Sequence, residues 1–86
     1  MLATAMRYGE IRDAIQRTGY VEVRQLPTGE WAGIKNLLYH VAICVGMKPG
    51  NAHTAMFCFD TWSEATCSLD RWSGEGFPPG YKARGL

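Results

Sequence analysis

The stretch TAMFCFDTWSEATCSLDRWSGEGFPPG, residues 54–80, determines most of the expected fold. Its apolar and aromatic beginning, residues 54–59, is typical of a buried strand. Thr61 and Glu64 then have the T-x-x-E spacing of a capping box, in which each side chain bonds a backbone N–H at the start of a helix. Gly74 follows the last residue of the helical pattern, and two prolines prevent its continuation. The stretch therefore predicts a strand, a capped helix and a stop, in that order.

The predicted helix, residues 61–73, carries an apolar stripe that we expect to lie on the sheet. The stripe recurs at helical spacing and consists of Trp62, Ala65, Leu69 and Trp72. From about residue 74 the sequence predicts an extended, polyproline-like tail. Two interpretations of this tail stay open. Either Phe77 and Tyr81 fold back beside Trp72 and cap the core, or the tail docks in a groove of another protein.

The chain before this stretch predicts four further elements from its hydrophobic periodicity. The first is a helix over residues 7–18, with Gly19 directly after its last residue. The other three are strands over residues 20–26, 30–34 and 37–45. In the first of these strands, alternation places Val21 and Val23 on one face. Leu26-Pro27-Thr28-Gly29 has the composition of a type I turn and joins the first two strands into a hairpin. The third strand is apolar on both faces, as expected of a central strand.

These elements predict a single small α+β domain over residues 1–86, with a Gly/Pro tail from about residue 74. The predicted order is α-β-β-β-β-α. Three or four antiparallel strands would be packed on one face by the two short helices. A chain of 86 residues, of which 47% are hydrophobic, suits one domain with one core and argues against disorder.

Charge and hydropathy limit the partners and the location. Nine Lys/Arg against eight Asp/Glu give a net charge of +1. This balance argues against an acidic mimic of nucleic acid and provides no broad basic field for phosphate backbones. The N-terminus lacks the apolar region of a signal peptide, and the longest apolar run, residues 37–47, is about half of the ~20 residues that span a bilayer. We therefore expect a cytoplasmic protein with no membrane partner.

Cysteine and histidine residues form catalytic and metal sites in other proteins, but in this sequence they do not occur at the spacings typical of such sites. Cys44, Cys58 and Cys67 are odd in number and lack a C-x-x-C motif, so we expect reduced, buried thiols; the alternative is one disulfide and one free thiol. A thiol enzyme using Cys58 or Cys44 is the less favoured interpretation, because His40 lies ~13 Å from Cys44 along an extended strand. His53 is interpreted as a solvated loop residue, and zinc-site spacing is lacking. We predict no enzyme, no metal and no cofactor.

Single-stranded nucleic-acid binding by the sheet face is the alternative function. The rings available for stacking are Trp31, Tyr39, Phe57 and Phe59, with charge from Arg12, Arg24 and Lys35. No basic-aromatic run of the kind found in RNA-binding sheets accompanies them. We therefore expect these aromatic side chains to form the core instead.

Three segments resemble small proteins of bacteriophages and proteobacterial prophages: GIKNLLYHVAICVG (33–46), FCFDTWSEA (57–65) and LDRWSGEGFPPGYKARG (69–85). The likeness covers about residues 20–85 and centres on a C-terminal W-x-G-x-G-x-PPG pattern. This chain has Trp72-Ser73-Gly74 where the family usually has WDG. The family has no assigned catalytic residues to carry over. The resemblance implies a phage accessory protein of the kind that binds and blocks a host machine, as anti-CRISPR inhibitors do.

The sequence therefore predicts a non-enzymatic protein-binding module in a bacterial cytoplasm, with a host or phage protein as its partner. Interfaces favour Trp, Tyr, Met and Arg. The predicted contact residues are Arg24, Trp31, Lys35, Tyr39, Tyr81, Lys82 and Arg84. A homodimer through the edge strand 20–26 is a further expectation, because a short sheet leaves an edge to protect.

Overall fold

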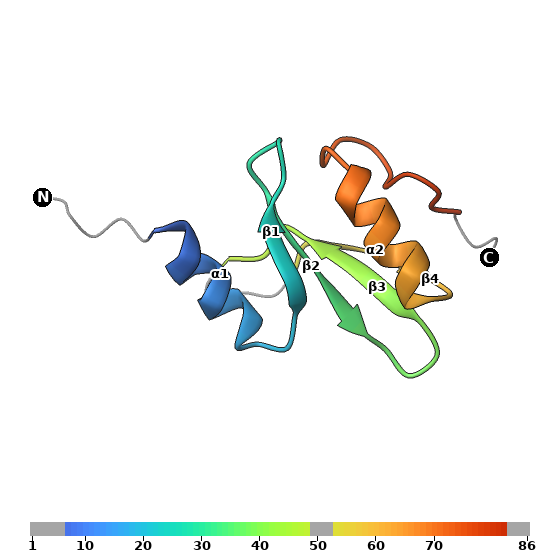
Figure 1. Cartoon of the computed structure of the whole chain (residues 1–86), viewed down its shortest axis with the longest axis horizontal. Coiled ribbons are helices and arrows are strands. Elements are labelled where there is room, and N and C mark those ends of the chain that lie inside the picture. Colours follow the sequence, from blue (N-terminus) through green and yellow to red (C-terminus); the bar gives the residue numbers. More distant parts are fainter. Residues whose placement is uncertain (1–6, 49–52, 83–86) are drawn as a thin grey trace, which may run out of the picture.

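The computed structural model describes residues 7–48 and 53–82 as an antiparallel sheet flanked by two helices (Figure 1). Its elements, in chain order, are α1 (Tyr8–Gln16), β1 (Val21–Gln25), β2 (Trp31–Asn36), β3 (Val41–Val45), β4 (Ala55–Phe59) and α2 (Trp62–Arg71). The strands lie in the order β1-β2-β3-β4, and every neighbouring pair is antiparallel. The predicted α+β class, the antiparallel sheet and the order α-β-β-β-β-α are confirmed.

The two helices pack on opposite faces of the sheet (Figure 1). On one face, Leu69 of α2 joins a core that includes Ile34 and Ile43. On the other face, Ile15 of α1 joins a core that includes Trp31. The expectation that both helices share one face is wrong. The reason is that every residue of β3 is buried, so this central strand presents apolar side chains on both faces and each face needs a cover.

The connection between β2 and β3 is a tight turn rather than part of a strand. The Leu37 N–H donates to the His40 carbonyl at 2.8 Å, and Asn36 pairs with Val41 at the base of the turn. β3 therefore begins at Val41, and the prediction of a strand over residues 37–45 is wrong at its start. Antiparallel pairing with β2 requires a chain reversal at this point, and an apolar pattern does not reveal it.

A bulge in β1 changes which of its side chains face each core. The pairing with β2 shifts between Val21 and Arg24, and Glu22 has a φ of 54°, in the left-handed region. Val23 is buried, whereas Val21 is 43% exposed; the expectation that these two valines share a face is wrong, because a bulge breaks the alternation. The guanidinium of Arg24 is directed at α2 and forms an ion pair with the carboxylate of Asp70.

Two local signals in the sequence are confirmed by hydrogen bonds. The Gly29 N–H donates to the Leu26 carbonyl at 2.7 Å and closes the predicted turn between β1 and β2. The hydroxyl of Thr61 accepts a hydrogen bond from the Glu64 N–H at 3.2 Å and caps α2 as predicted. The helix ends at Arg71, slightly earlier than the sequence predicts.

The chain that follows α2 folds back onto β4. The Tyr81 ring lies 5.1 Å from the Phe57 ring and 5.9 Å from the Phe59 ring, between centroids. Phe57 also meets Trp72 edge to face at 5.5 Å. Of the two interpretations of the tail, folding back is therefore the one observed within residues 53–82. Phe77 contacts Phe57 and Tyr81 but remains 70% exposed. Arg84 lies outside the described residues.

Candidate functional site: the hairpin tip

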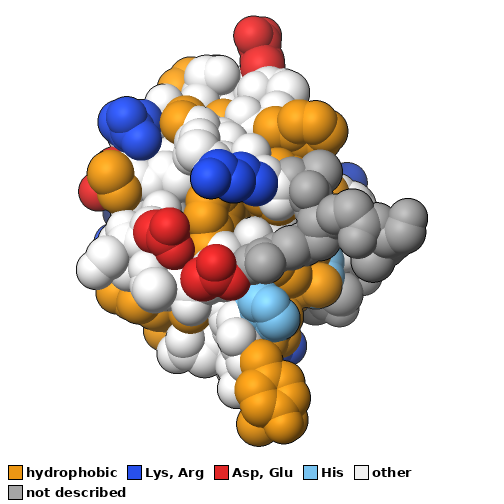
Figure 2. All heavy atoms as spheres, turned by 90° about the vertical axis from the view of Figure 1, so that its right-hand side faces the viewer, with side chains coloured by type: hydrophobic (Ala, Val, Ile, Leu, Met, Phe, Trp, Pro, Cys, Tyr) orange, Lys and Arg blue, Asp and Glu red, His pale blue; other side chains and the backbone are white. Residues whose placement is uncertain are grey.

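The hairpin tip, defined as residues 37–40 between β2 and β3, carries the most exposed large apolar side chains of the described residues. Leu38 is 86% exposed and Tyr39 is 82% exposed. Figure 2 views the end of the molecule on which the tip lies, and hydrophobic side chains project from its lower edge beside a histidine. Exposed apolar residues that occur singly are ordinary, but adjacent ones form a patch typical of a contact surface.

The sheet holds the tip in a defined position. Val41 at the base of the turn pairs with Asn36 on one side and with Phe59 on the other, and both Val41 and Phe59 are buried. The tip extends beyond this row, and within residues 7–48 and 53–82 no strand of the sheet pairs with it. The tip is therefore an exposed apolar turn that projects from a rigid sheet.

Trp62 adds a third large apolar side chain near this end of the sheet, because α2 begins shortly after β4 ends at Phe59. The sequence predicts that Trp62 lies on the sheet, but its side chain is exposed. Ala65 and Leu69 of the same stripe are buried as predicted. Trp62 differs from them because it is the first residue of α2 and precedes the turns that contact the core.

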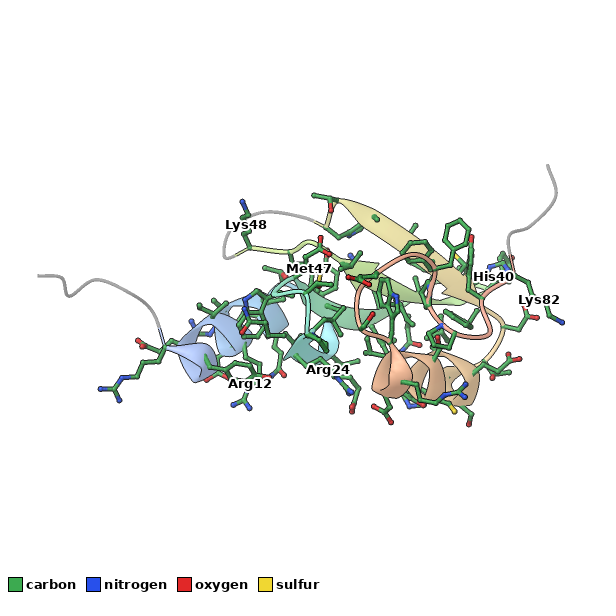
Figure 3. The ribbon with its side chains drawn as sticks, turned by 90° about the horizontal axis from the view of Figure 1, so that it is seen from above. Arg12, Arg24, His40, Met47, Lys48 and Lys82 are labelled. Carbon is green, nitrogen blue, oxygen red and sulfur yellow. The ribbon has the colours of Figure 1, made fainter. Side chains whose placement is uncertain are left out.

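Two of the seven predicted contact residues are exposed within the described chain, namely Tyr39 and Lys82. Figure 3 shows Lys82 and His40 at the same end along the long axis of the molecule, and Arg12 and Lys48 toward the other end. In Figure 1 the turn between β2 and β3 lies at the lower edge of the molecule, and the last described residues of the tail lie well above it. The tip therefore stands apart from Lys82.

Two predicted contact residues stabilise the fold instead. Trp31 is buried on the α1 face of the sheet, and the ring of Tyr8 lies 4.8 Å from it between centroids. Tyr81 is half-buried against the Phe57 ring. Large aromatic side chains of this kind dominate the core of a small domain, so neither is available as a free anchor.

The two predicted cations on the strands also have intramolecular partners. The Lys35 ammonium lies 5.4 Å from the centroid of the Tyr20 ring, an arrangement that stabilises by about 0.5–1 kcal/mol at an exposed site. Arg24 forms ion pairs with Asp70 and with Glu22. Of the seven predicted residues, the six that the structure describes are therefore not gathered into one surface.

The sequence pattern does not indicate that Leu38 is a contact residue. Its neighbours are apolar, so the sequence predicts a buried strand at this position. One signal could have located it: the predicted strand over residues 37–45 is longer than the 5–6 residues that are most common. A strand of ordinary length ending at Val45 begins at Val41, and this leaves Leu38 in a turn.

The three cysteines are free and occupy three different environments. Cys44 is fully buried in β3. The pKa of its thiol is raised to about 11, mainly by burial. The nearby charge of Lys35 lowers this pKa and Cys58 raises it, both by less than burial does. Cys58 is half-buried and Cys67 is exposed, so the expectation of three buried thiols is wrong for Cys67. Because the thiolate is the reactive form of cysteine, the environment of Cys44 disfavours a role as nucleophile.

The raised pKa of Cys44 predicts a loss of stability at alkaline pH. In the unfolded chain the thiol loses its proton near pH 9, whereas the folded chain keeps it until about pH 11. Deprotonation therefore favours the unfolded state across this window, by up to about 1.4 kcal/mol per pH unit. Urea denaturation at pH 8, 9 and 10 should show a steeper fall for the wild type than for Cys44→Ala. An equal fall of stability with pH in the two proteins would contradict the raised pKa of Cys44.

His53 has a defined partner. Its Nδ1 lies 2.8 Å from the Tyr20 hydroxyl, and the ring is half-buried, so the expectation of a solvated loop histidine is wrong. Within residues 7–48 and 53–82, no three His, Cys, Asp or Glu side chains gather in a way that could hold a metal ion. In the same part of the chain, neither helix combines the length and the apolar character that crossing a membrane requires.

The four rings considered for stacking on nucleic-acid bases do not share an open surface. Trp31 is buried on the α1 face. Phe57 and Phe59 lie on the α2 face, with Tyr81 against both. Tyr39 projects from the tip. Base stacking uses a ring whose face is free, and these rings form no common platform.

Comparison with known proteins gives no relative for this fold or sequence: the chain matches no protein-family model, no curated protein and no solved structure.

Proposed function

We propose that the chain is a non-enzymatic protein-binding module whose contact surface is the hairpin tip. We further propose that it acts in a bacterial cell as a phage- or prophage-derived accessory protein that inhibits a host machine such as a CRISPR effector. The observation that carries the binding role is the adjacent exposure of Leu38 and Tyr39 on a closed turn. The phage origin rests on the resemblance of residues 20–85 to phage and prophage proteins.

The tip has the physical properties of a binding anchor. Its backbone is fixed by the hydrogen bond from Leu37 to His40 and by the buried row at its base, so little backbone conformational freedom remains to be lost on binding. Tyrosine is enriched among the residues that dominate interface energetics. Full burial of a leucine side chain stabilises a complex by roughly 1.5–3 kcal/mol.

The shape of the tip indicates the kind of partner surface. A projecting turn with uncharged Leu37, Leu38 and Tyr39 fits an apolar pocket rather than a flat or charged face. A small rigid domain that fills a pocket excludes the natural occupant of that pocket. This mode of action is suited to an inhibitor that has no chemistry of its own.

Affinity capture from a bacterial host lysate tests the binding role. Tagged wild type and the double variant Leu38→Ser/Tyr39→Ser are used as baits, and the retained proteins are quantified by mass spectrometry. We expect at least about a tenfold loss of the specific partner with the double variant, equivalent to 1.4 kcal/mol. The melting temperature should change little, because surface substitutions usually cost within about 0.5 kcal/mol.

A matched control separates the tip from apolar exposure in general. Val21 is also apolar and exposed, but it lies on the edge strand β1, opposite Ile34 and outside the turn, so Val21→Ser should retain the partner as the wild type does. The inhibitory role is tested in bacteria with an active CRISPR system, in which the wild type should restore plasmid establishment and the double variant should not. Equal capture by wild type and double variant would contradict the proposed site.

A further inference from the structure

We propose that the free edge of β4 pairs with β4 of a second copy of the chain, antiparallel across a two-fold axis at Phe57. The product is a symmetric dimer with one continuous eight-stranded sheet. This inference is independent of the partner bound by the hairpin tip. It follows from the contrast between the two edges of the sheet, from the direction of the β4 backbone groups and from the apolar side chains beside them.

The two edge strands differ in how well they are protected against pairing. β1 has a bulge, a left-handed Glu22 and an ion-paired Arg24, which are devices that block edge-to-edge association. β4 has the sequence AMFCF, with no charge and no proline, and its register with β3 is regular throughout. The expected homodimer through residues 20–26 would use the protected edge, so we place the dimer contact on β4.

The hydrogen-bond pattern shows which β4 backbone groups face outward. The Gly46 N–H donates to the Trp31 carbonyl at 2.8 Å, so even-numbered residues of β3 bond to β2 and odd-numbered residues bond to β4. In the register of β3 and β4, Phe57 lies opposite Ile43 and directs its backbone inward. The N–H and C=O groups of Met56 and Cys58 therefore point to the free edge.

With a two-fold axis at Phe57, all of these N–H and C=O groups form hydrogen bonds with the second copy. Met56 then lies opposite the partner's Cys58, and the two residues exchange N–H···O=C hydrogen bonds; the symmetry produces the same pair again on the other side of the axis. Phe57 lies opposite the partner's Phe57 in a non-hydrogen-bonded pair, where side chains approach most closely. Aromatic pairs at such positions stabilise antiparallel strands.

Apolar side chains flank this edge on both faces of the sheet. Met56 is 43% exposed on the face that α1 partly covers, and Phe77 is 70% exposed on the α2 face, where its ring lies 5.9 Å from the Phe57 ring. In the dimer these side chains would meet their symmetry mates or the partner's β4. Figure 3 shows β4 along one long side of the molecule, with its outer edge away from β3.

The occupant that best fits this edge is a second copy rather than a foreign strand. An uncharged strand pairs with itself without like-charge repulsion across the two-fold axis. With one open edge and one protected edge, association stops at a closed dimer and does not continue into a fibre. The self-complementary register described above uses every outward group of Met56 and Cys58.

Sedimentation velocity on the full chain over a range of concentrations tests the dimer. The wild type should shift from its monomer mass of 9.6 kDa to twice that mass as concentration rises. Met56→Lys places two charges at the contact while leaving the bonds between β3 and β4 intact, and should raise the dimer dissociation constant at least about tenfold. Val21→Lys on β1 is the matched control and should leave this constant unchanged.

Amide hydrogen exchange locates the contact independently of any variant. The N–H groups of Met56 and Cys58 should become protected as concentration rises, while the outward N–H groups of β1 should not. A chain that stays monomeric at about 1 mM would overturn the proposal, and so would a dimer that leaves the Met56 and Cys58 amides unprotected. A monomer whose β4 amides are protected only by an added peptide would also overturn it, in favour of a foreign strand.

Discussion

Replacing Ile43 with alanine is expected to lower the free energy of unfolding by about 3–4 kcal/mol. Ile43 is fully buried in the middle of β3, paired with Ile34 on one side and with Phe57 on the other. Its truncation leaves a cavity between the sheet and α2 that the neighbouring strands cannot close by small shifts. Domains of this size have a total stability of only about 0.05–0.15 kcal/mol per residue, so the loss is a large fraction of the total.

Urea denaturation followed by circular dichroism measures this effect. The control is Leu38→Ala, which removes a leucine side chain of similar size from the exposed tip and should change stability by no more than about 0.5 kcal/mol. Comparable losses for the two variants would show that Leu38 is packed against the rest of the chain. In that event the tip would be part of the core and would not be free to bind a partner.

Replacing Gly46 with alanine is expected to cost about 2–4 kcal/mol, from backbone strain together with overpacking. Gly46 has a φ of +87°, which side-chain-bearing residues rarely adopt, and a Cβ placed there would press directly on the side chain of Thr54. The Thr54 N–H donates to the Val45 carbonyl at 2.9 Å, and its hydroxyl donates to the same oxygen at 3.2 Å. Moving Thr54 aside therefore weakens the junction between β3 and β4.

Gly29 provides the control for backbone strain alone. Its φ is +95°, close to that of Gly46, but a Cβ at Gly29 would meet no other atom within 4 Å. Gly29→Ala should therefore be the milder substitution of the two, measured by the same urea denaturation. Equal losses would mean that the contact with Thr54 contributes nothing, and that the packing described at this junction is incorrect.

Elements whose signals are local in sequence were predicted well. α2 was located by the cap at Thr61 and by the spacing of Ala65 and Leu69, all of which lie within two or three turns. The turn at Gly29 was located by its own composition. In each case the residues that form the feature are neighbours along the chain, so no knowledge of the remaining structure is needed.

Three features that depend on the register of the strands and on packing were not predicted. The reversal at residues 37–40 is imposed by the pairing of Asn36 with Val41, and the bulge at Glu22 is imposed by the register with β2. The placement of the helices on opposite faces follows from the two-sided burial of β3. An apolar run is compatible with burial on either face, and it says nothing about which helix provides the cover.

The candidate site was predicted only in part, for a related reason. Tyr39 was expected to contact a partner and is exposed, but Trp31 was expected to do the same and is buried on the α1 face. Residue type indicates which side chains are suited to an interface, whereas exposure depends on the tertiary fold. Leu38 is the opposite case, since its type and neighbours suggested burial and only the turn exposes it.

Site-specific photocrosslinking tests most directly whether the hairpin tip is the contact surface. A photoreactive phenylalanine analogue replaces Tyr39 in one protein and Phe77 in another, since both side chains are exposed and aromatic but only Tyr39 lies on the tip. After irradiation in the bacterial host lysate, position 39 should yield one dominant adduct with a host protein, and position 77 should not yield that adduct. An adduct with the same protein from position 77 alone, or none from position 39, would contradict the account.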